Sequence, residues 1–189
     1  LIYGASGTGK SAIARWLHNH GPRAGGVFLT FDRRTPIQAQ IAAAQGGTLV
    51  LSEIAELTLG EQNLLREVLS TRSVPHPIDP ALRMLVNTRI VATTSHFLEG
   101  RAQTGLFSNE LLKALNVFRI DMPRLEQRTE EFEDITTGIL REIAHDLRKD
   151  HLKGLSGEAW NQLRSYSWPG NLRELRNVLK FAAVRASGS

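Results

Sequence analysis

Hydrophobic residues occur along the chain in two patterns, as short continuous runs and as longer segments with helical spacing. In the helical segment at residues 11–20, Ile13, Trp16 and Leu17 share one face, so we expect Trp16 to lie in the core. The short runs, which predict strands, are residues 1–3, 27–31, 48–51, 89–94 and 117–120. Strands that alternate with helices in this way predict a parallel α/β sheet of five strands with flanking helices.

Capping residues and glycines mark the ends of the predicted helices. Thr35 and Pro36 are typical of a helix start, and the two glycines at residues 46–47 end that helix. The spacing of Thr58 and Glu61 predicts a capping box, in which each side chain bonds the backbone N–H of the other residue, at the start of the next helix.

The pattern changes after Pro123, where only helical spacing remains. One predicted helix carries hydrophobic residues on a single face between Phe132 and Leu147, and two more begin at Ser156 and Asn171. A charged stretch at residues 124–128 separates the last strand from these helices. We therefore predict an α/β subdomain at residues 1–125 and an α-helical subdomain at residues 126–189.

Composition narrows the class of protein without identifying a partner. The 189 residues, 41% of them hydrophobic, suffice for one sizeable core or for a large and a small subdomain. The net charge of +4 is spread along the chain, which fits a solvated surface as well as a nucleic-acid partner. The chain has no cysteine, and its six histidines lack ligand spacing, so we expect neither disulfides nor a histidine metal site.

Targeting features are not visible in the sequence. No apolar run reaches the roughly 18 residues that a membrane-spanning helix needs. No signal peptide precedes the first motif. We therefore expect a cytoplasmic protein without a membrane partner.

Residues 4–11 read G-A-S-G-T-G-K-S and match the phosphate-loop pattern G-x-x-x-x-G-K-[ST] between a strand and a helix. In such a loop, glycines let backbone N–H groups surround phosphate oxygens, and the helix N-terminus adds a favourable dipole. Lys10 supplies a positive charge for the β- and γ-phosphates, and Ser11 offers a hydroxyl to Mg²⁺. ATP or ADP with Mg²⁺ is the expected cofactor; the alternative is a glycine-rich turn that binds nothing. The predicted phosphate-binding residues are Gly4, Ser6, Gly7, Thr8, Gly9, Lys10 and Ser11.

Four segments resemble the central AAA+ domain of sigma-54-dependent transcription activators, the bacterial enhancer-binding proteins. The phosphate loop is similar to their G-E-S-G-T-G-K-E, and residues 46–57 resemble their Walker B segment G-G-T-L-F-L-D-E-I-x-E-L. Residues 115–120 resemble R-L-N-V-x-x-I, and residues 168–175 match W-P-G-N-[VL]-R-E-L. The four motifs occur in the family's order and cover nearly the whole chain.

The resemblance implies an AAA+ P-loop fold with a helical lid, and self-association, from a dimer to a hexamer-type ring, with nucleotide bound between subunits. It also implies an RNA polymerase or sigma-factor partner, and DNA bound by a helix-turn-helix domain outside this stretch. On the family's pattern, Glu53 is the catalytic carboxylate that polarises water, Ser95 occupies the sensor I position, and Arg173 senses the γ-phosphate. Arg173 is alternatively an ordinary arginine on an exposed helix face.

The chain departs from the family's pattern where hydrolysis is concerned. Ser52 replaces the Walker B aspartate, and Ser95 replaces the usual sensor I asparagine. Ser108 and Ala114 stand where F-R-E-D-L-x-x-R-L-N places the arginine fingers, although Lys113 could substitute in part. These replacements predict weak or absent ATP hydrolysis.

The loop that carries the family's G-A-F-T-G-A motif, which contacts sigma-54, also finds no counterpart. Only 14 residues separate Phe31 from Gly46, and the predicted helix takes up most of them. We therefore expect this loop to be missing, and a regulator that does not use sigma-54.

Three hypotheses remain open. In the first, nucleotide is an assembly ligand inside a transcription regulator rather than fuel. In the second, the domain is a working ATPase of the sigma-54 type, in which Glu53, Lys113 and Arg119 supply the missing functions. In the third, it is a scaffold that has lost nucleotide. Separately from these three, an effector such as a cyclic dinucleotide is open, since its charged phosphates suit an arginine-rich surface.

Overall fold

The computed structural model describes all residues except 77–78, 80, 150–151, 153 and 187–189. Contacts divide the chain into two compact units. We call the first the sheet unit (Leu1–Gly4 and Lys10–Met122) and the second the helical unit (Ala5–Gly9 and Pro123–Ser189). The predicted subdomain boundary at residues 125–126 stays a prediction. Among the described residues, no helix combines the length and the apolarity required to cross a membrane.

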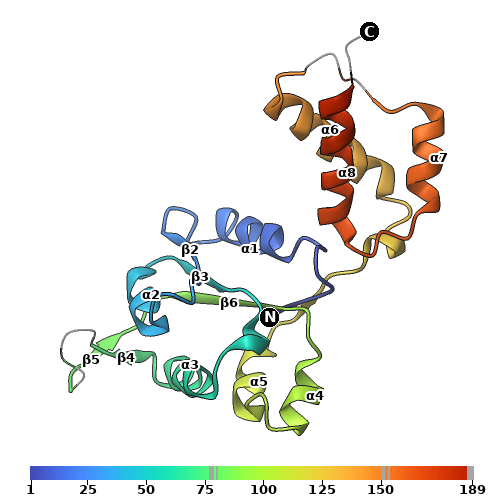
Figure 1. Cartoon of the computed structure of the whole chain (residues 1–189). Coiled ribbons are helices and arrows are strands. Elements are labelled where there is room, and N and C mark those ends of the chain that lie inside the picture. The colour runs from blue at the N-terminus through green and yellow to red at the C-terminus, as the bar shows by residue number, and fades with distance from the viewer. Residues whose placement is uncertain (77–78, 80, 150–151, 153, 187–189) are drawn as a thin grey trace. The chain divides into compact units, whose positions relative to one another are not determined.

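A parallel sheet forms the centre of the sheet unit (Figure 1). Among the described residues it contains five strands in the order β2-β3-β6-β1-β7. Their bounds are Ile2–Tyr3 for β1, Phe28–Thr30 for β2, Thr48–Leu51 for β3, Arg89–Thr94 for β6 and Ile120–Asp121 for β7. All neighbouring pairs are parallel, which confirms the predicted sheet.

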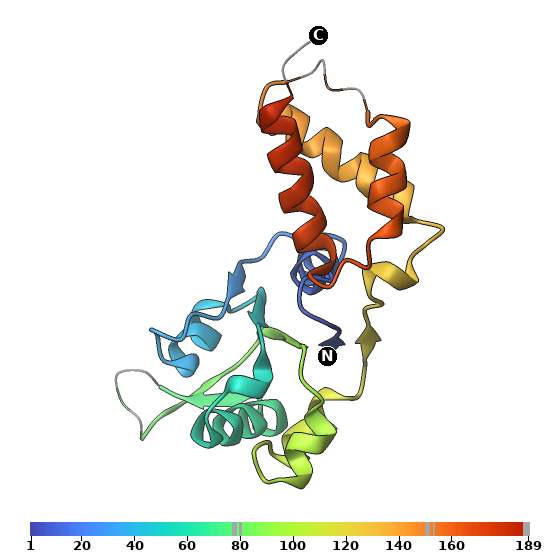
Figure 2. The same cartoon turned by 45° about the vertical axis from the view of Figure 1, so that its right-hand side comes forward.

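Alternation along β3 explains why helices cover both faces of this sheet. Leu49 and Leu51 belong to one hydrophobic cluster and Val50 to another, because successive side chains of a strand point to opposite faces. Helix α1 (Lys10–Asn19) packs on the Val50 side. On the Leu49 side pack α2 (Ile37–Ala43), α3 (Leu59–Thr71), α4 (Leu98–Gln103) and α5 (Asn109–Leu115). Figures 1 and 2 show α1 apart from α2 and α3 across the sheet.

Helix starts in the sheet unit agree only in part with the predicted caps. Thr58 and Glu61 form the predicted capping box at the start of α3. Thr35 does not cap α2: Pro36 occupies the N-cap position and has no side-chain cap bond. Instead the buried Gln40 amide donates to the carbonyls of Asp32 and Thr35 and thereby holds the chain that leads into the helix. Within the connection from β2 to β3, α2 is the one helix.

Two further predictions for the sheet unit are wrong. Trp16 is 55% exposed and stacks on the ring of His20, because the buried side of α1 carries Ala14 and His18, and Trp16 lies on the opposite side of the turn. The predicted strand at residues 117–120 begins only at Ile120, and Val117 and Phe118 are exposed. The sequence patterns also missed α4, α5, the short helix η1 (Ile54–Glu56) and an antiparallel hairpin of β4 (Ser73–Pro75) and β5 (Arg83–Leu85).

Helices alone make up the described part of the helical unit beyond Pro123, as predicted. These are the short η2 (Leu125–Gln127), α6 (Phe132–Asp146), α7 (Gly157–Ser165) and α8 (Asn171–Arg185). They pack around Trp168, Leu175 and Leu179, with Trp160 partly buried against them. Ser156 caps α7 as predicted, and the Lys149 ammonium donates to the last carbonyls of α8, where a cation is favoured by the helix dipole.

Candidate nucleotide site

The residues singled out in the sheet unit follow the carboxyl ends of neighbouring strands. The order β3-β6-β1 places these three ends side by side, since all pairs are parallel. Gly4 follows β1, Glu53 lies two residues beyond β3, and Ser95 follows β6. In open α/β sheets, ligands bind at this edge, so the topology brings together residues that lie far apart in sequence.

Lys10 is the positive centre of this edge. Its side chain is 8% exposed, and its Nζ donates to the Gly4 carbonyl at 2.8 Å and lies 3.4 Å from Oε1 of Glu53. Helix α1 begins at Lys10 and has no acidic residue in its first turn, so no side chain of that turn offsets the positive end of its dipole. Ser11, the predicted Mg²⁺ ligand, follows in the same turn and is exposed.

Glu53 is held in place from two sides. Its Oε2 accepts hydrogen bonds from the backbone N–H of Ser95 at 2.8 Å and from the Ser95 hydroxyl at 2.9 Å. Its backbone adopts a left-handed φ of 50°, which is uncommon outside glycine. Partial burial acts to raise the pKa of the Glu53 carboxyl, but the two Ser95 bonds and the Lys10 charge lower it below its ordinary value. The carboxylate is therefore ionised at neutral pH and neutralises Lys10.

The loop between Gly4 and Lys10 belongs to the helical unit, which consists of Ala5–Gly9 and the chain from Pro123 onward. Gly7 and Gly9 have φ values of 82° and 96°, which only glycine adopts readily. The Thr8 hydroxyl donates to the Ala5 carbonyl at 2.9 Å and closes the turn. The loop thus has the tightly curved backbone that is typical of anion-binding turns.

The turn before α8 packs directly on this loop. A Cβ placed on Gly7 would lie 2.2 Å from the carbonyl oxygen of Gly170, so only a glycine fits there. Arg173, from the first turn of α8, donates from Nη1 to the Ser6 hydroxyl at 3.1 Å. Ser6, Arg173 and Gly170 border a cavity of about 400 Å³, whose other walls are Pro169, Glu174, Asn177 and Val178.

The structure therefore gathers the predicted residues into two groups. Lys10, Glu53 and Ser95 meet in the sheet unit, and the loop and Arg173 meet in the helical unit. Sequence patterns missed two contributors. His96 places Nδ1 3.5 Å from Oε2 of Glu53, and the buried Asn171 bonds the loop.

The positions of the expected arginine fingers have other roles or none. Ser108 caps α5 by accepting from the Leu111 N–H, while Lys113 and Ala114 are exposed on that helix. Arg119 forms ion pairs with Glu99 and Asp121 and lies over the Tyr3 ring. Its guanidinium is thus engaged inside the sheet unit.

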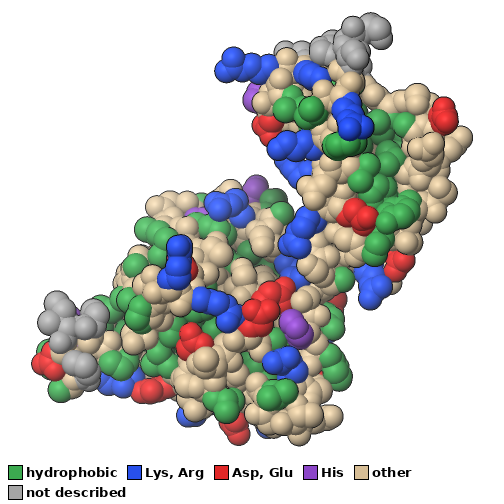
Figure 3. Space-filling view, in the orientation of Figure 1, with side chains coloured by type: hydrophobic (Ala, Val, Ile, Leu, Met, Phe, Trp, Pro, Cys, Tyr) green, Lys and Arg blue, Asp and Glu red, His purple; other side chains and the backbone are tan. Residues whose placement is uncertain are grey.

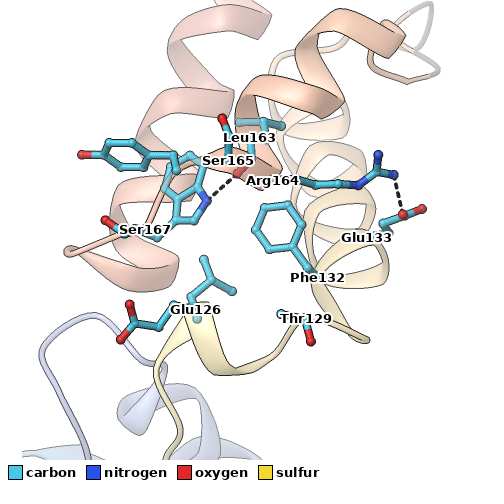
Figure 4. A pocket seen from close by; sticks show the side chains of 11 residues that line it. Glu126, Thr129, Phe132, Glu133, Leu163, Arg164, Ser165 and Ser167 are labelled. Atoms are coloured by element: carbon cyan, nitrogen blue, oxygen red, sulfur yellow. Dashed lines mark hydrogen bonds and ion pairs between the residues drawn. The ribbon is translucent and has the colours of Figure 1, made fainter.

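A second cavity, of about 390 Å³, lies within the helical unit away from the predicted residues (Figure 4). Phe132 and Trp168 form its apolar walls, and an ion pair joins Arg164 to Glu133 at its side. The Trp168 indole donates to the Leu163 carbonyl, as the dashed line in Figure 4 shows. Two pairs of its lining residues are thus bonded to each other.

On the face of the sheet unit seen in Figure 3, charges do not gather by sign. On the face in Figure 3, its described Lys and Arg side chains lie among Asp and Glu side chains. Ion pairs such as Arg33–Glu56 and Arg34–Asp32 account for part of this mixture. The distribution favours a solvated surface over an extended nucleic-acid footprint on this face.

Comparison with known families assigns both parts of the chain. Residues 1–125 match the sigma-54 interaction domain, and residues 126–189 match an AAA+ ATPase lid domain. The chain belongs to the sigma-54 interaction family of AAA+ domains. This confirms the AAA+ fold with a C-terminal helical lid that the motifs indicated.

Two of the similar proteins are regulators that are longer than the chain. The DNA-binding transcriptional regulator NtrC of Salmonella typhimurium is 33% identical over 211 residues, which cover 100% of the chain and 45% of that protein. The Nif-specific regulatory protein of Klebsiella pneumoniae is 33% identical, with 97% of the chain and 39% of that protein covered. The chain thus spans less than half of these relatives.

Solved structures of NtrX from Brucella abortus share the fold. The ADP complex superposes with a TM-score of 0.83 at 30% identity and covers 95% of the chain and 44% of NtrX. The ATP complex gives a TM-score of 0.82 at 28% identity and covers 100% of the chain and 48% of NtrX.

Proposed function

We propose that this domain binds ATP or ADP at residues 4–11 and serves as the nucleotide-controlled central part of a bacterial transcription regulator. The observation that carries the proposal is the phosphate loop itself. Gly7 and Gly9 adopt positive φ, Lys10 begins a helix without acidic residues in its first turn, and Arg173 reaches the loop at Ser6. These groups suit a polyphosphate, and NtrX, a relative, has been crystallised with ADP and with ATP.

Mg²⁺ fits these residues less well than phosphate does. Ser11 offers an exposed hydroxyl, but Ser52 supplies no charge where the resemblance implies an aspartate. Hard divalent cations favour carboxylate ligands. When bound, Mg²⁺ would neutralise phosphate charge, and we propose that this domain holds it weakly, through Ser11.

Weak or absent hydrolysis is the second part of the proposal. The finger positions carry Ser108, which caps a helix, and Ala114, which is exposed and apolar. Lys113 lacks the planar fork of arginine, and Arg119 is already paired with Glu99 and Asp121. Arginine fingers are worth about 10³–10⁵ in rate, so their replacement outweighs the retained Glu53.

The third part concerns the sigma-54 contact. The connection from β2 to β3 holds the seven-residue helix α2, which leaves no room for a second helix and a protruding loop. The alignment with NtrC also runs over 211 residues against 189 in the chain, as expected if the chain lacks a segment. We therefore propose that the RNA polymerase or sigma-factor contact does not use the family's G-A-F-T-G-A loop.

Nucleotide then acts through assembly. A ligand that binds one association state more tightly shifts the population toward it without turnover. We propose self-association, from a dimer to a hexamer-type ring, as the output, and DNA contact through a helix-turn-helix domain outside residues 1–189.

An active ATPase is the second candidate, and one observation favours it. The Glu53 carboxylate is ionised, held by Ser95 and next to Lys10, which is what a water-polarising base needs. On this alternative, the purified domain turns over ATP, and Glu53→Gln abolishes the turnover.

The test is a titration with a fluorescent ATP analogue, with and without Mg²⁺, read together with the oligomeric state. Wild type is expected to bind, with little dependence on Mg²⁺, and to change its oligomeric state on binding. Lys10→Ala is expected to lose binding. Equal, negligible binding by both proteins would overturn the proposal in favour of a scaffold.

A further inference from the structure

Asn171 is a buried residue that joins three segments of the helical unit. It is 2% exposed and begins α8 with a left-handed φ of 53°. Its Nδ2 donates to the Ser6 carbonyl at 3.0 Å, and its Oδ1 accepts from the Leu125 N–H at 2.9 Å. One carboxamide therefore bonds the phosphate loop and the short helix η2 at once.

These contacts require asparagine specifically. The position needs a residue that tolerates positive φ, which favours Gly, Asn and Asp. It also needs one donor for Ser6 and one acceptor for Leu125, and of these three residues only Asn provides both. Asp keeps the acceptor and loses the donor, and Gly keeps the backbone conformation alone.

The bond to Ser6 sets the direction of a loop amide. The Ser6 carbonyl and the Gly7 N–H belong to one peptide plane, and no described peptide bond is cis, so the two groups point in opposite directions. Turning the carbonyl toward Asn171 directs the Gly7 N–H away from the lid turn. The Gly170 carbonyl, which excludes a Cβ on Gly7, packs against the same loop at the next residue.

We propose that Asn171 is a positioning residue for the phosphate loop, which orients the Ser6–Gly7 peptide and couples the loop to Leu125. This inference rests on the proposed nucleotide binding by residues 4–11. It is separate from the role of Arg173, which engages the Ser6 side chain rather than its backbone.

The experiment compares Asn171→Asp, Asn171→Gly and the matched control Asn161→Asp in the 189-residue chain. Asn161 is exposed on α7, so its substitution makes the same chemical change without the loop contact. Two quantities are measured: the affinity for a fluorescent ADP analogue, and hydrogen exchange of the amides at residues 7–9 without nucleotide.

Both Asn171 variants are expected to speed exchange at residues 7–9 and to weaken ADP binding roughly five- to tenfold, the usual effect of one hydrogen bond. Asn161→Asp is expected to change neither. Ser6→Ala, which keeps the carbonyl, is expected to leave the exchange rates unchanged. Because Asn171→Gly is neutral, its effect excludes simple repulsion between Asp and phosphate.

Three results would overturn the inference. One is unchanged exchange and affinity in both Asn171 variants; another is weaker binding in Asn171→Asp alone, which would indicate charge repulsion. The third is an effect in Asn171→Gly alone, which would assign the role to the Leu125 bond. If wild type binds no nucleotide but both variants still loosen the loop, the proposed function fails and the positioning role stands.

Discussion

The two units differ in how closely their candidate residues match the family's pattern. In the sheet unit, short uncharged residues occupy the Walker B, sensor I and finger positions: Ser52, Ser95, Ser108 and Ala114. In the helical unit, the turn at residues 168–175 matches the family motif throughout, and its Arg173 and Asn171 both bond the loop. On the proposed function, the residues that surround phosphate are retained, whereas most of those that would help cleave it, Glu53 excepted, are replaced.

Physical chemistry explains why these functions separate. An anion is held by backbone amides, a helix N-terminus and one ammonium, none of which requires an acidic residue. Cleavage requires charges placed where the transition state develops them, and neutral side chains do not supply these. We therefore expect a domain that loses the second set, as proposed for this chain, to bind nucleotide still.

The largest expected effect comes from restoring the replaced groups. The triple variant Ser52→Asp, Ser108→Arg and Ala114→Arg is expected to raise ATP turnover at least about 100-fold, given the value of arginine fingers. Ala114 is exposed, so its change is tolerated, while losing the Ser108 cap costs α5 about 1 kcal/mol. Phosphate release at high protein concentration measures the effect. Turnover that stays at the wild-type level would show that other parts are missing.

Gly7→Ala is expected to have the next largest effect. The new Cβ would meet the Gly170 carbonyl oxygen at 2.2 Å, and the φ of 82° is itself strained for alanine. Nucleotide affinity is expected to fall by at least about tenfold, and the stability of the helical unit by about 2 kcal/mol. Fluorescence titration and thermal unfolding measure the two.

Gly105→Ala is the matched control for Gly7→Ala. Gly105 has a φ of 74° with nothing near its Cβ position, so its substitution adds strain without a collision. Its cost is expected to be about 1 kcal/mol, with unchanged nucleotide affinity. Equal effects at both glycines would contradict the close contact between loop and turn.

Ser95→Ala is expected to have the smallest effect, and one that depends on pH. It removes one of two Ser95 bonds to Glu53, raises the pKa of that carboxyl toward its ordinary value, and costs about 1 kcal/mol at pH 7. A lowered pKa contributes stability above the ordinary value near 4.5, and this is lost as pH falls through the folded-state pKa. Unfolding of both proteins between pH 7 and pH 3 checks this, and a pH-independent difference would contradict it.

Local sequence patterns predicted the fold well where they depended on neighbouring residues. The apolar run at 48–51 and the Thr58–Glu61 capping box both appear as expected. The prediction that Trp16 lies in the core was wrong because the buried side of α1 carries Ala14 and His18, and hydrophobicity alone does not predict their burial. The prediction of a strand at residues 117–120 was wrong because Val117 and Phe118 are of residue types common in strands, although both are exposed here.

The candidate site residues likewise differ in whether a sequence pattern predicts them. A continuous motif revealed Lys10 and Ser11, and the resemblance pointed to Glu53, Ser95 and Arg173. Sequence patterns did not predict the role of Asn171, because its partner Ser6 lies 165 residues away and no local pattern encodes such a contact. Sequence patterns also did not predict His96. It follows Ser95 in sequence and lies near Glu53 only because β3 and β6 are neighbouring strands.

On the proposed function, this domain binds ATP and does not hydrolyse it. The most direct test mixes excess purified domain with radiolabelled ATP and Mg²⁺ and follows bound nucleotide and released phosphate over time. We expect the bound nucleotide to stay ATP, and Glu53→Gln to behave like wild type. Prompt phosphate release that disappears in Glu53→Gln would contradict this expectation.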